Sequence, residues 1–460
     1  MPFGVLRDLR HSGHGFVAAL LSASLLVSLL GGCHGATPPA ERRPALCPGC
    51  NVILISLDTV RADHVGAYGY PKPTTPNVDA LAAHAAVFDR AISQSSWTRA
   101  SHMSIFTGLP PSGHGFKSLK DRHRLPDSVP TLASVLRSGG YRTAGFTGGV
   151  NVAGAFGFDA GFDTYRSNGK YLRDNLEDIR YWLDQHHGER FFLFVHGYEP
   201  HTPYLADPVD RIALGMRAKA PKRGLKDFCR RAREHRNIAR FVDAYDAAIR
   251  RGDRYVGKLL AHLDKLGLRE RSLIVFVSDH GEEFLEHGRC FHLTTLYGEV
   301  LHVPLVISGP GVEPGRIAAT VPGSSSIAAT IAEAVGIAGT PLPGFSLVPY
   351  LRGEPADPPE AVLSETSRSI EGGNGDGEVR ALTTSRGKLI EWLTRGGTEY
   401  FDYATDPGEQ LPLASGFEYE KLLARLRSEN ATKKTPAAQP AEDVVDRQLQ
   451  EQLRSFGYVE

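Results

Sequence analysis

Two apolar stretches of this 460-residue chain end abruptly at a carboxylic acid. The stretch 51–57, NVILISL, leads directly to Asp58, and the stretch 273–277, LIVFV, is followed after one serine by Asp279. Continuous apolar runs of this length are typical of strands that are buried on both faces of a sheet. Ligands of open α/β sheets bind beyond the carboxyl ends of the strands. We therefore expect both acids to belong to one metal-centred site.

Further apolar runs of similar length are expected to complete the sheet, and they span residues 143–146, 191–195 and 303–307. Stretches with helical spacing, such as 78–88 and 129–138, separate the expected strands. Continuous apolar strands that alternate with amphipathic helices predict an α/β fold. Its central sheet should be mostly parallel and covered by helices on both faces.

The pattern changes from about residue 361. Residues 381–393 and 398–403 are typical of antiparallel strands joined by glycine-containing turns, which predicts a small C-terminal subdomain over residues 361–429. Residues 430–460 are expected to form a linker followed by a terminal helix over 443–455.

The N-terminus has the pattern of an export signal. Arg7 and Arg10 precede an apolar run, 16–30, that is too short for a comfortable membrane span. The run ends in Leu-Gly-Gly-Cys, which resembles a bacterial lipobox. Residues 1–33 are therefore interpreted as a lipoprotein signal peptide that ends at Cys33, and residues 34–49 as a tether. We expect an exported protein of the bacterial cell envelope, lipid-anchored at the periplasmic or outer-membrane face.

Net charge does not indicate a partner, because acidic and basic residues balance at 52 each. An exported lipoprotein would rarely meet nucleic acid, so we expect no nucleic-acid partner. The segment 211–240 has eleven Lys and Arg residues against two acids. It is either a solvated helix and loop or a basic lip that attracts anionic substrates or lipid headgroups. Cys47 and Cys50 are expected to form a disulfide or to remain spare thiols.

Several separated motifs follow one another along the chain. They are TPNVDALA from Thr75, SWTRASHMSIFTG from Ser96, FGFDAGFDTY from Phe156, EPHTPY from Glu199, VFVSDHGEEFLEHG from Val275 and TLYGEVLHVPLVISGPG from Thr295. In the order of these motifs the chain resembles the sulfatase family of the alkaline phosphatase-like superfamily, from about residue 51 to the C-terminus. The resemblance implies a catalytic domain over residues 50–360 with the fold of that superfamily.

The resemblance has one chemically important departure. Sulfate-cleaving members of the family carry Cys-x-Pro-Ser-Arg, or a serine version, whose first residue is oxidised to formylglycine. Here Thr98 stands at that position, Ala100 replaces the proline and His102 replaces the arginine. The family's Gly-Lys-Trp-His element is also absent, because residues 146–152 read FTGGVNV. Threonine cannot become formylglycine, so the resemblance implies a Thr98 nucleophile activated by a metal, and a preference for phosphorus over sulfur.

The resemblance assigns four residues to the metal: Asp58, Thr98, Asp279 and His280. The sulfatases proper have two adjacent acids at the first position and Asp-Asn at the second. This chain instead has Asp-Thr and Asp-His. The loss of an acid and the gain of an imidazole shift the preference from calcium toward zinc or manganese. We expect one divalent metal ion, with zinc or manganese favoured and calcium as the alternative.

Three histidines are expected to assist catalysis. His201 and His292 match family positions that hold the oxygens of the transferring group, and they could protonate the leaving oxygen. His102 could orient Thr98 or the anion. In a rival arrangement, His201 and His292 would bind a second zinc together with a carboxylate, but Gly197 stands where that acid would be.

Two further histidines have weaker assignments. His114, in PSGHGF, is left open between a structural and a functional role. His287, in LEHG, is expected to be a supporting or surface residue.

We therefore expect a metal-dependent hydrolase of sulfate or phosphate esters that forms a covalent ester on Thr98. Its substrate would be anionic, a glycan or a lipid. Two alternatives stay open. One is an envelope phosphoethanolamine- or glycerophosphate-type transferase, in which an alcohol replaces water. The other is an inactive binding lipoprotein that has kept the fold.

Overall fold

The computed structural model describes residues 44–167, 169–217, 234, 238–337, 342–368, 377–432 and 444–455. The chain divides into two compact units, Met1–Pro44 and Ala45–Glu460, and the second is described below. The predicted signal peptide, Cys33 and most of the tether lie outside the described residues, as does most of the segment 211–240. Within the described part, no helix is both long and apolar enough to cross a membrane.

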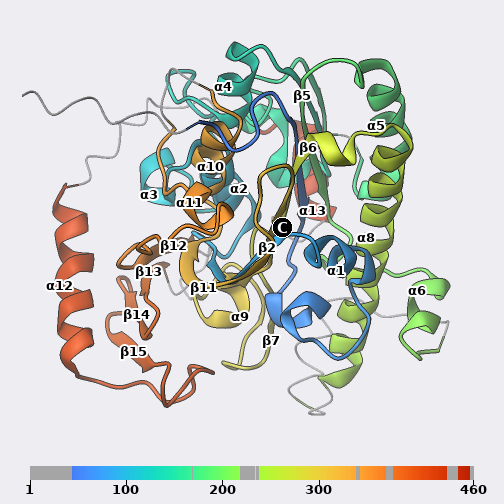
Figure 1. Cartoon of the computed structure of the whole chain (residues 1–460). Coiled ribbons are helices and arrows are strands. Elements are labelled where there is room, and N and C mark those ends of the chain that lie inside the picture. Colours follow the sequence, from blue (N-terminus) through green and yellow to red (C-terminus); the bar gives the residue numbers. More distant parts are fainter. Residues whose placement is uncertain are drawn as a thin grey trace, which may run out of the picture. The chain divides into compact units, whose positions relative to one another are not determined.

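A nine-stranded sheet forms the centre of the second unit (Figure 1). Its strands are β1 (Asn51–Leu57), β2 (Ala86–Ile92), β3 (Arg142–Phe146), β4 (Thr164–Arg166), β5 (Phe191–Gly197), β6 (Ser272–Val277), β9 (His302–Val303), β10 (Leu305–Ser308) and β11 (Gly315–Pro322). Their order is β11-β2-β10-β6-β1-β5-β3-β4, and β9 pairs with β2. β10 is antiparallel to β6 and β2, whereas β6, β1, β5, β3 and β4 pair in parallel. The mostly parallel sheet expected from the sequence is confirmed.

Helices cover both faces of this sheet, as expected from the apolar sequence of β1. Alternate side chains of a strand point to opposite faces. Ile53, Ile55 and Leu57 pack against α1 (Pro76–Ala82), α5 (Leu172–His186) and α8 (Ala239–Lys265). Val52 and Leu54 pack with α2 (Thr98–Thr107), α4 (Leu132–Ser138) and α10 (Ile327–Ala334). β1 is therefore held from both sides, and the residue that follows it has a fixed position.

A separate antiparallel sheet follows in the C-terminal part. It has the order β12 (Val362–Arg368), β13 (Gly377–Thr383), β14 (Gly387–Trp392) and β15 (Thr398–Asp402). Helix α12 (Phe417–Thr432) packs on it through Leu422 and Leu426. The terminal helix α13 (Arg447–Ser455) instead packs Leu449 and Leu453 into the core around Val150. The small antiparallel C-terminal sheet is confirmed.

The remaining elements are short. They are η1 (Ala62–His64), η2 (Gly66–Tyr68), α3 (Pro111–His114), η3 (Val150–Val152), η4 (Gly154–Phe156), α6 (Pro208–Ala213), η5 (Arg269–Arg271), β7 (Glu283–Phe284), β8 (Cys290–Phe291), α9 (Gly298–Leu301) and α11 (Val348–Leu351). Cys47 and Cys50 form a disulfide just before β1, which is the first of the two states expected for this pair.

Two expected elements differ from the structure. The helix expected over 78–88 is wrong beyond Ala82, where α1 ends, because Ala86 begins β2 between β10 and β11. Pairing with these neighbours outweighs the local helical spacing. The strand expected over 303–307 is divided at Pro304 into β9 and β10. A proline has no N–H to donate to a sheet, so it interrupts the pairing.

His287 connects the loop after β7 to the C-terminal part. Its Nδ1 lies 2.6 Å from Glu299 Oε1, its Nε2 lies 2.7 Å from the carbonyl oxygen of Glu409, and its ring stacks on Tyr297 at 3.6 Å. Burial favours the neutral ring, but the hydrogen bond and the charge of Glu299 raise the pKa of His287 to about 9. His287 is therefore a mostly buried supporting residue, not a surface residue.

This contact predicts a pH dependence of stability. The folded-state pKa of His287, about 9, lies above the ordinary value of 6.5. The protonated ring therefore stabilises the fold fully below the ordinary value, and this contribution is lost as the pH rises through the folded-state value. His287→Gln should flatten the fall in melting temperature across this window, measured by calorimetry. The exposed His84→Gln is the control, and parallel curves for His287→Gln and the wild type would contradict the assignment.

Candidate active site

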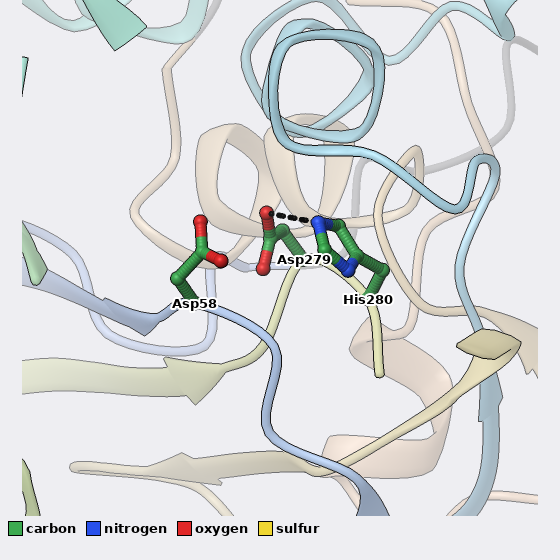
Figure 2. A group of neighbouring side chains, drawn as sticks. All are labelled: Asp58, Asp279 and His280. Carbon is green, nitrogen blue, oxygen red and sulfur yellow. Dashed lines mark ion pairs between the residues drawn. The ribbon is translucent and has the colours of Figure 1, made fainter. Parts of the chain in front are cut away.

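Three strand ends meet at one edge of the central sheet. Asp58 follows β1, Asp279 and His280 follow its neighbour β6, and β5 ends beside β1 on the other side. Because these strands are parallel, their carboxyl ends lie at the same edge. Figure 2 shows Asp58, Asp279 and His280 as neighbours from the two strand ends, with Asp279 between the other two.

The four residues assigned to the metal lie together. Asp58, Asp279 and His280 offer ligand atoms that are all within 4.8 Å of one another. Thr98 Oγ1 lies 3.2 Å from Asp58 Oδ2 and 3.4 Å from His280 Nε2. All four side chains are fully buried. The structure thus brings together residues that are up to 222 positions apart in the chain.

The chemistry of this group fits a divalent cation. Among the described residues, Asp58 Oδ1 and Asp279 Oδ2 have no hydrogen-bond partner although both are buried. Burial raises the pKa of both carboxyl groups, and the Asp58 charge raises that of Asp279 further. Two neighbouring carboxylates that are buried away from water need a compensating positive charge. Mixed carboxylate and imidazole ligands suit zinc or manganese better than calcium.

His280 is oriented as a metal ligand requires. Its Nδ1 lies 2.9 Å from the carbonyl oxygen of Gly281, so Nδ1 carries the proton and Nε2 carries the lone pair. Nε2 lies 3.3 Å from Asp279 Oδ2. Burial opposes the charged ring, but Asp279 and Asp58 together raise the pKa of His280.

Helix α2 packs against the end of β6 and positions the four residues assigned to the metal. Thr98 is its first residue, and Gly108 ends it in a left-handed conformation. Ser101 Oγ donates to the carbonyl oxygen of Asp279 at 2.7 Å, and Ser93 Oγ binds the same oxygen at 2.5 Å. The helix that carries Thr98 is therefore fixed directly to the strand end that carries Asp279.

His102 lies behind the metal ligands. Its Nδ1 lies 2.9 Å from the carbonyl oxygen of Thr98 and 3.4 Å from Asp279 Oδ2, and its Nε2 lies 2.9 Å from Ser56 Oγ. Burial lowers its pKa to about 3, so the ring is neutral at physiological pH. These contacts support the orienting role for His102, because both of its ring nitrogens already bind groups of the protein.

His201 and His292 lie next to each other at the site. Their ring centroids are 5.2 Å apart, and that of His292 is 4.5 Å from His280. His201 Nδ1 donates to the carbonyl oxygen of Thr202 at 2.9 Å, and burial lowers its pKa to about 3. The one compact group of three metal-ligating side chains among the described residues is Asp58, Asp279 and His280, and neither His201 nor His292 belongs to it.

Glu282 is a site residue that was not predicted from the sequence. Its Oε1 lies 2.9 Å from His292 Nδ1, its Oε2 accepts from the Tyr204 hydroxyl at 3.0 Å, and burial raises its pKa to about 8. Glu282 therefore orients His292. Its place two residues after His280 was the available signal.

His196 was also missed. It is the next-to-last residue of β5 and is fully buried beside the site. Like Asp58, His196 is a polar residue at the carboxyl end of a continuous apolar run, and this feature could have identified it from the sequence.

His114, which the sequence left open, has a structural place. Its Nε2 lies 3.1 Å from Ser104 Oγ, and its Nδ1 accepts from the Phe116 N–H at 3.2 Å. Both ring nitrogens are thus used in holding the turn after α2.

Comparison with known proteins agrees with this geometry. Residues 50–337 match the model of the family described as Sulfatase. The chain belongs to the sulfatase family. It is accordingly a hydrolase that acts on ester bonds.

Several relatives of this sulfatase-family protein are similar over most of their length. A Delta 4,5-hexuronate-2-O-sulfatase of Bacteroides thetaiotaomicron is 24% identical, over 86% of this chain and 89% of the relative. An ulvan-active sulfatase of Formosa agariphila is 26% identical, over 82% and 79%. The solved phosphonate monoester hydrolase of Agrobacterium radiobacter has a TM-score of 0.65 at 19% identity and covers 83% of this chain and 95% of its own. The fold is therefore shared with that structure.

The buried carboxylates predict opposite effects of one mutation. Asp279→Asn keeps an acceptor for the Thr59 N–H, which lies 3.2 Å from Asp279 Oδ1. It removes one of two adjacent charges. We expect the Asp279→Asn variant to lose most of the bound metal, because a ligand is removed. We also expect a higher melting temperature for the metal-free variant, because the repulsion between the Asp58 and Asp279 carboxylates is gone. Elemental analysis and calorimetry on chelated protein measure the two effects.

Asp246→Asn is the matched control. Asp246 is equally buried but is paired with Lys72 and His64, so its replacement should lower stability and leave the metal content unchanged. Unaltered metal content in Asp279→Asn would contradict the ligand assignment.

Proposed function

We propose that this protein hydrolyses sulfate or phosphate esters through a covalent ester on Thr98. The observation that carries the proposal is the position of Thr98 Oγ1, 3.2 Å from Asp58 Oδ2 and 3.4 Å from His280 Nε2. It stands at the first turn of α2, where the sulfatase-type nucleophile is expected. Thr98 is thereby next to three candidate metal ligands and needs no oxidation to act.

A divalent metal held by Asp58, Asp279, His280 and Thr98 would lower the pKa of the threonine hydroxyl and neutralise negative charge. Asp58 Oδ2 accepts a hydrogen bond from the Thr98 hydroxyl. In the first step, a bond forms between Thr98 Oγ1 and sulfur or phosphorus as the bond to the ester oxygen breaks in line. Thr98 attacks as the alkoxide, its hydroxyl proton having passed to solvent. The departing oxygen takes a proton from His292, and Thr98 keeps the transferred group.

The two outer histidines take different roles in this scheme. His201 Nδ1–H is committed to the Thr202 carbonyl, so a neutral His201 has its lone pair at Nε2. That nitrogen suits a general base for the water that releases the anion from Thr98. His292, oriented by Glu282, is the proposed donor to the departing oxygen. The scheme refines the earlier expectation that both rings hold the oxygens of the transferring group.

The relatives favour an anionic glycan as substrate. The two similar sulfatases are named for a hexuronate and for ulvan, which are saccharides. Threonine in place of the oxidisable residue favours phosphorus at the same site, so phosphate esters remain in the proposal. Zinc or manganese is the proposed metal, on the basis of the imidazole ligand.

A Thr98 series tests the nucleophile. Thr98→Ala should abolish turnover, whereas Thr98→Ser should retain a measurable part because it keeps a hydroxyl at the same place. Purified protein is assayed with an aryl sulfate, a phosphate monoester and a phosphodiester on one sample. Thr107→Ala is the control, because Thr107 Oγ1 binds two backbone groups at the end of α2, the Met103 carbonyl and the Leu109 N–H, and no residue of the site. Full activity of Thr98→Ala on every substrate would contradict the proposal.

We also propose that the protein is exported and held at a membrane by lipid on Cys33. The support is the lipobox-like sequence after an apolar run. Mass spectrometry of the native protein should find Cys33 lipidated and residues 1–32 removed. An intact Met1, or cleavage elsewhere with an unmodified Cys33, would contradict this anchor.

A further inference from the structure

His196 is a buried histidine that the proposed chemistry does not use. Its side chain is fully buried, and neither of its ring nitrogens has a hydrogen-bond partner among the described residues. A buried polar atom that lacks a partner costs about 1–3 kcal/mol. Two such atoms on one ring therefore indicate that His196 has a task that this arrangement does not complete.

The backbone fixes His196 next to Asp58. In the parallel pair of β1 and β5, His196 lies opposite Ser56, and the Asp58 N–H donates to the Gly197 carbonyl at 3.1 Å. His196 Nε2 then lies 3.5 Å from Asp58 Oδ2. That distance is slightly longer than a hydrogen bond, so a small movement of the carboxylate would complete the contact.

The ring is held in place by its neighbours. The His102 ring contacts it edge to face at 4.8 Å and the Tyr198 ring at 4.5 Å. Three of the other histidines of the site differ from His196 in one respect, whereas His292 Nδ1 binds the Glu282 carboxyl group. His102, His201 and His280 each place Nδ1 within 2.9 Å of a backbone carbonyl oxygen. Among the described residues His196 Nδ1 has no such bond, and Asp58 Oδ2 lies 3.5 Å from its Nε2.

Asp58 has a reason to need a second donor. Its Oδ2 accepts from Thr98 Oγ1, and its Oδ1 has no partner among the described residues. Once Thr98 gives up its proton as the nucleophile, Oδ2 loses that bond. A donor from β5 would then keep the carboxylate in the same orientation.

We propose that His196 is a positioning residue whose Nε2–H donates to Asp58 Oδ2 and so directs Asp58 Oδ1 toward the metal. This inference rests on the proposed function and adds to it. Hydrogen bonds of this kind orient the ligands of metal sites. His196 is not itself a ligand in this scheme, because it does not belong to the compact group of Asp58, Asp279 and His280.

The test measures metal affinity in the whole protein. Chelator competition with zinc and with manganese gives the dissociation constants of the wild type, His196→Met and His196→Gln. Methionine fills the space without a donor and should weaken binding by about 10–100-fold. Glutamine places an amide N–H near the position of Nε2 and should keep most of the affinity. His114→Gln, an equally buried histidine with both nitrogens bonded, should bind metal like the wild type.

Each result decides the inference. Wild-type affinity in a folded His196→Met overturns it, and equal losses in the methionine and glutamine variants overturn it in favour of a direct ligand. If the methionine variant does not fold, His196→Asn replaces it. Asparagine places its amide near Nδ1, so it should lose the affinity that glutamine keeps, and wild-type affinity in His196→Asn overturns the inference.

Asp279→Asn, measured in parallel, separates this inference from the proposed function. Wild-type affinity in that variant means that the metal site itself is wrong. Loss of metal in Asp279→Asn together with wild-type affinity in His196→Met leaves the metal site intact and removes only the role of His196.

Discussion

The site depends on two carboxylates, Asp58 and Asp279, that are buried side by side at the ends of adjacent parallel strands. Removing a carboxylate from water costs several kcal/mol even after relaxation, and a like charge beside it adds to that cost. The strands leave the acids no alternative position, because β1 is packed on both faces and pairs with β5 and β6. A bound cation offsets both penalties, so metal binding and the stability of this sheet edge are linked.

The groups around the carboxylates are arranged to keep them in place. Serines 93 and 101 bind the Asp279 carbonyl, and His102 joins the start of α2 to the Asp279 side chain. Glu282 fixes His292 in the same way from the β7 side. Thr98 is consequently presented by a rigid frame, which is what a nucleophile that attacks in line requires. In the proposed mechanism, Thr98 takes the place of the family's oxidisable residue as the attacking group within this frame.

The sequence predicted the parts of the fold in which local pattern and burial agree. β1, β5 and β6 are continuous apolar runs, and their strand ends led directly to Asp58 and Asp279. β2 was missed because Val87 and Phe88 also fit a helical spacing, and only pairing with β10 and β11 makes them a strand. The run 303–307 was similarly predicted as one strand, although Pro304 has no N–H to donate and divides it into β9 and β10.

The supporting histidines show the limit of such reasoning. A resemblance could place His102 near the nucleophile, but its contact with Asp279 joins positions 177 residues apart. Glu282 lies within the motif that begins at Val275, and His196 lies near the end of an apolar run, but their partners, His292 and Asp58, are in other segments of the chain. Strand order depends on contacts between distant segments, so local sequence patterns do not predict it.

The central claim is that Thr98 becomes covalently modified during turnover. Its most direct test is to quench the protein in acid within the first turnovers of an aryl sulfate and of a phosphodiester, digest it, and map the peptides by mass spectrometry. The account predicts a sulfo or phospho group on Thr98 that disappears when the substrate is exhausted. A modified group on another residue, or an unmodified Thr98 under conditions of burst release, would contradict it.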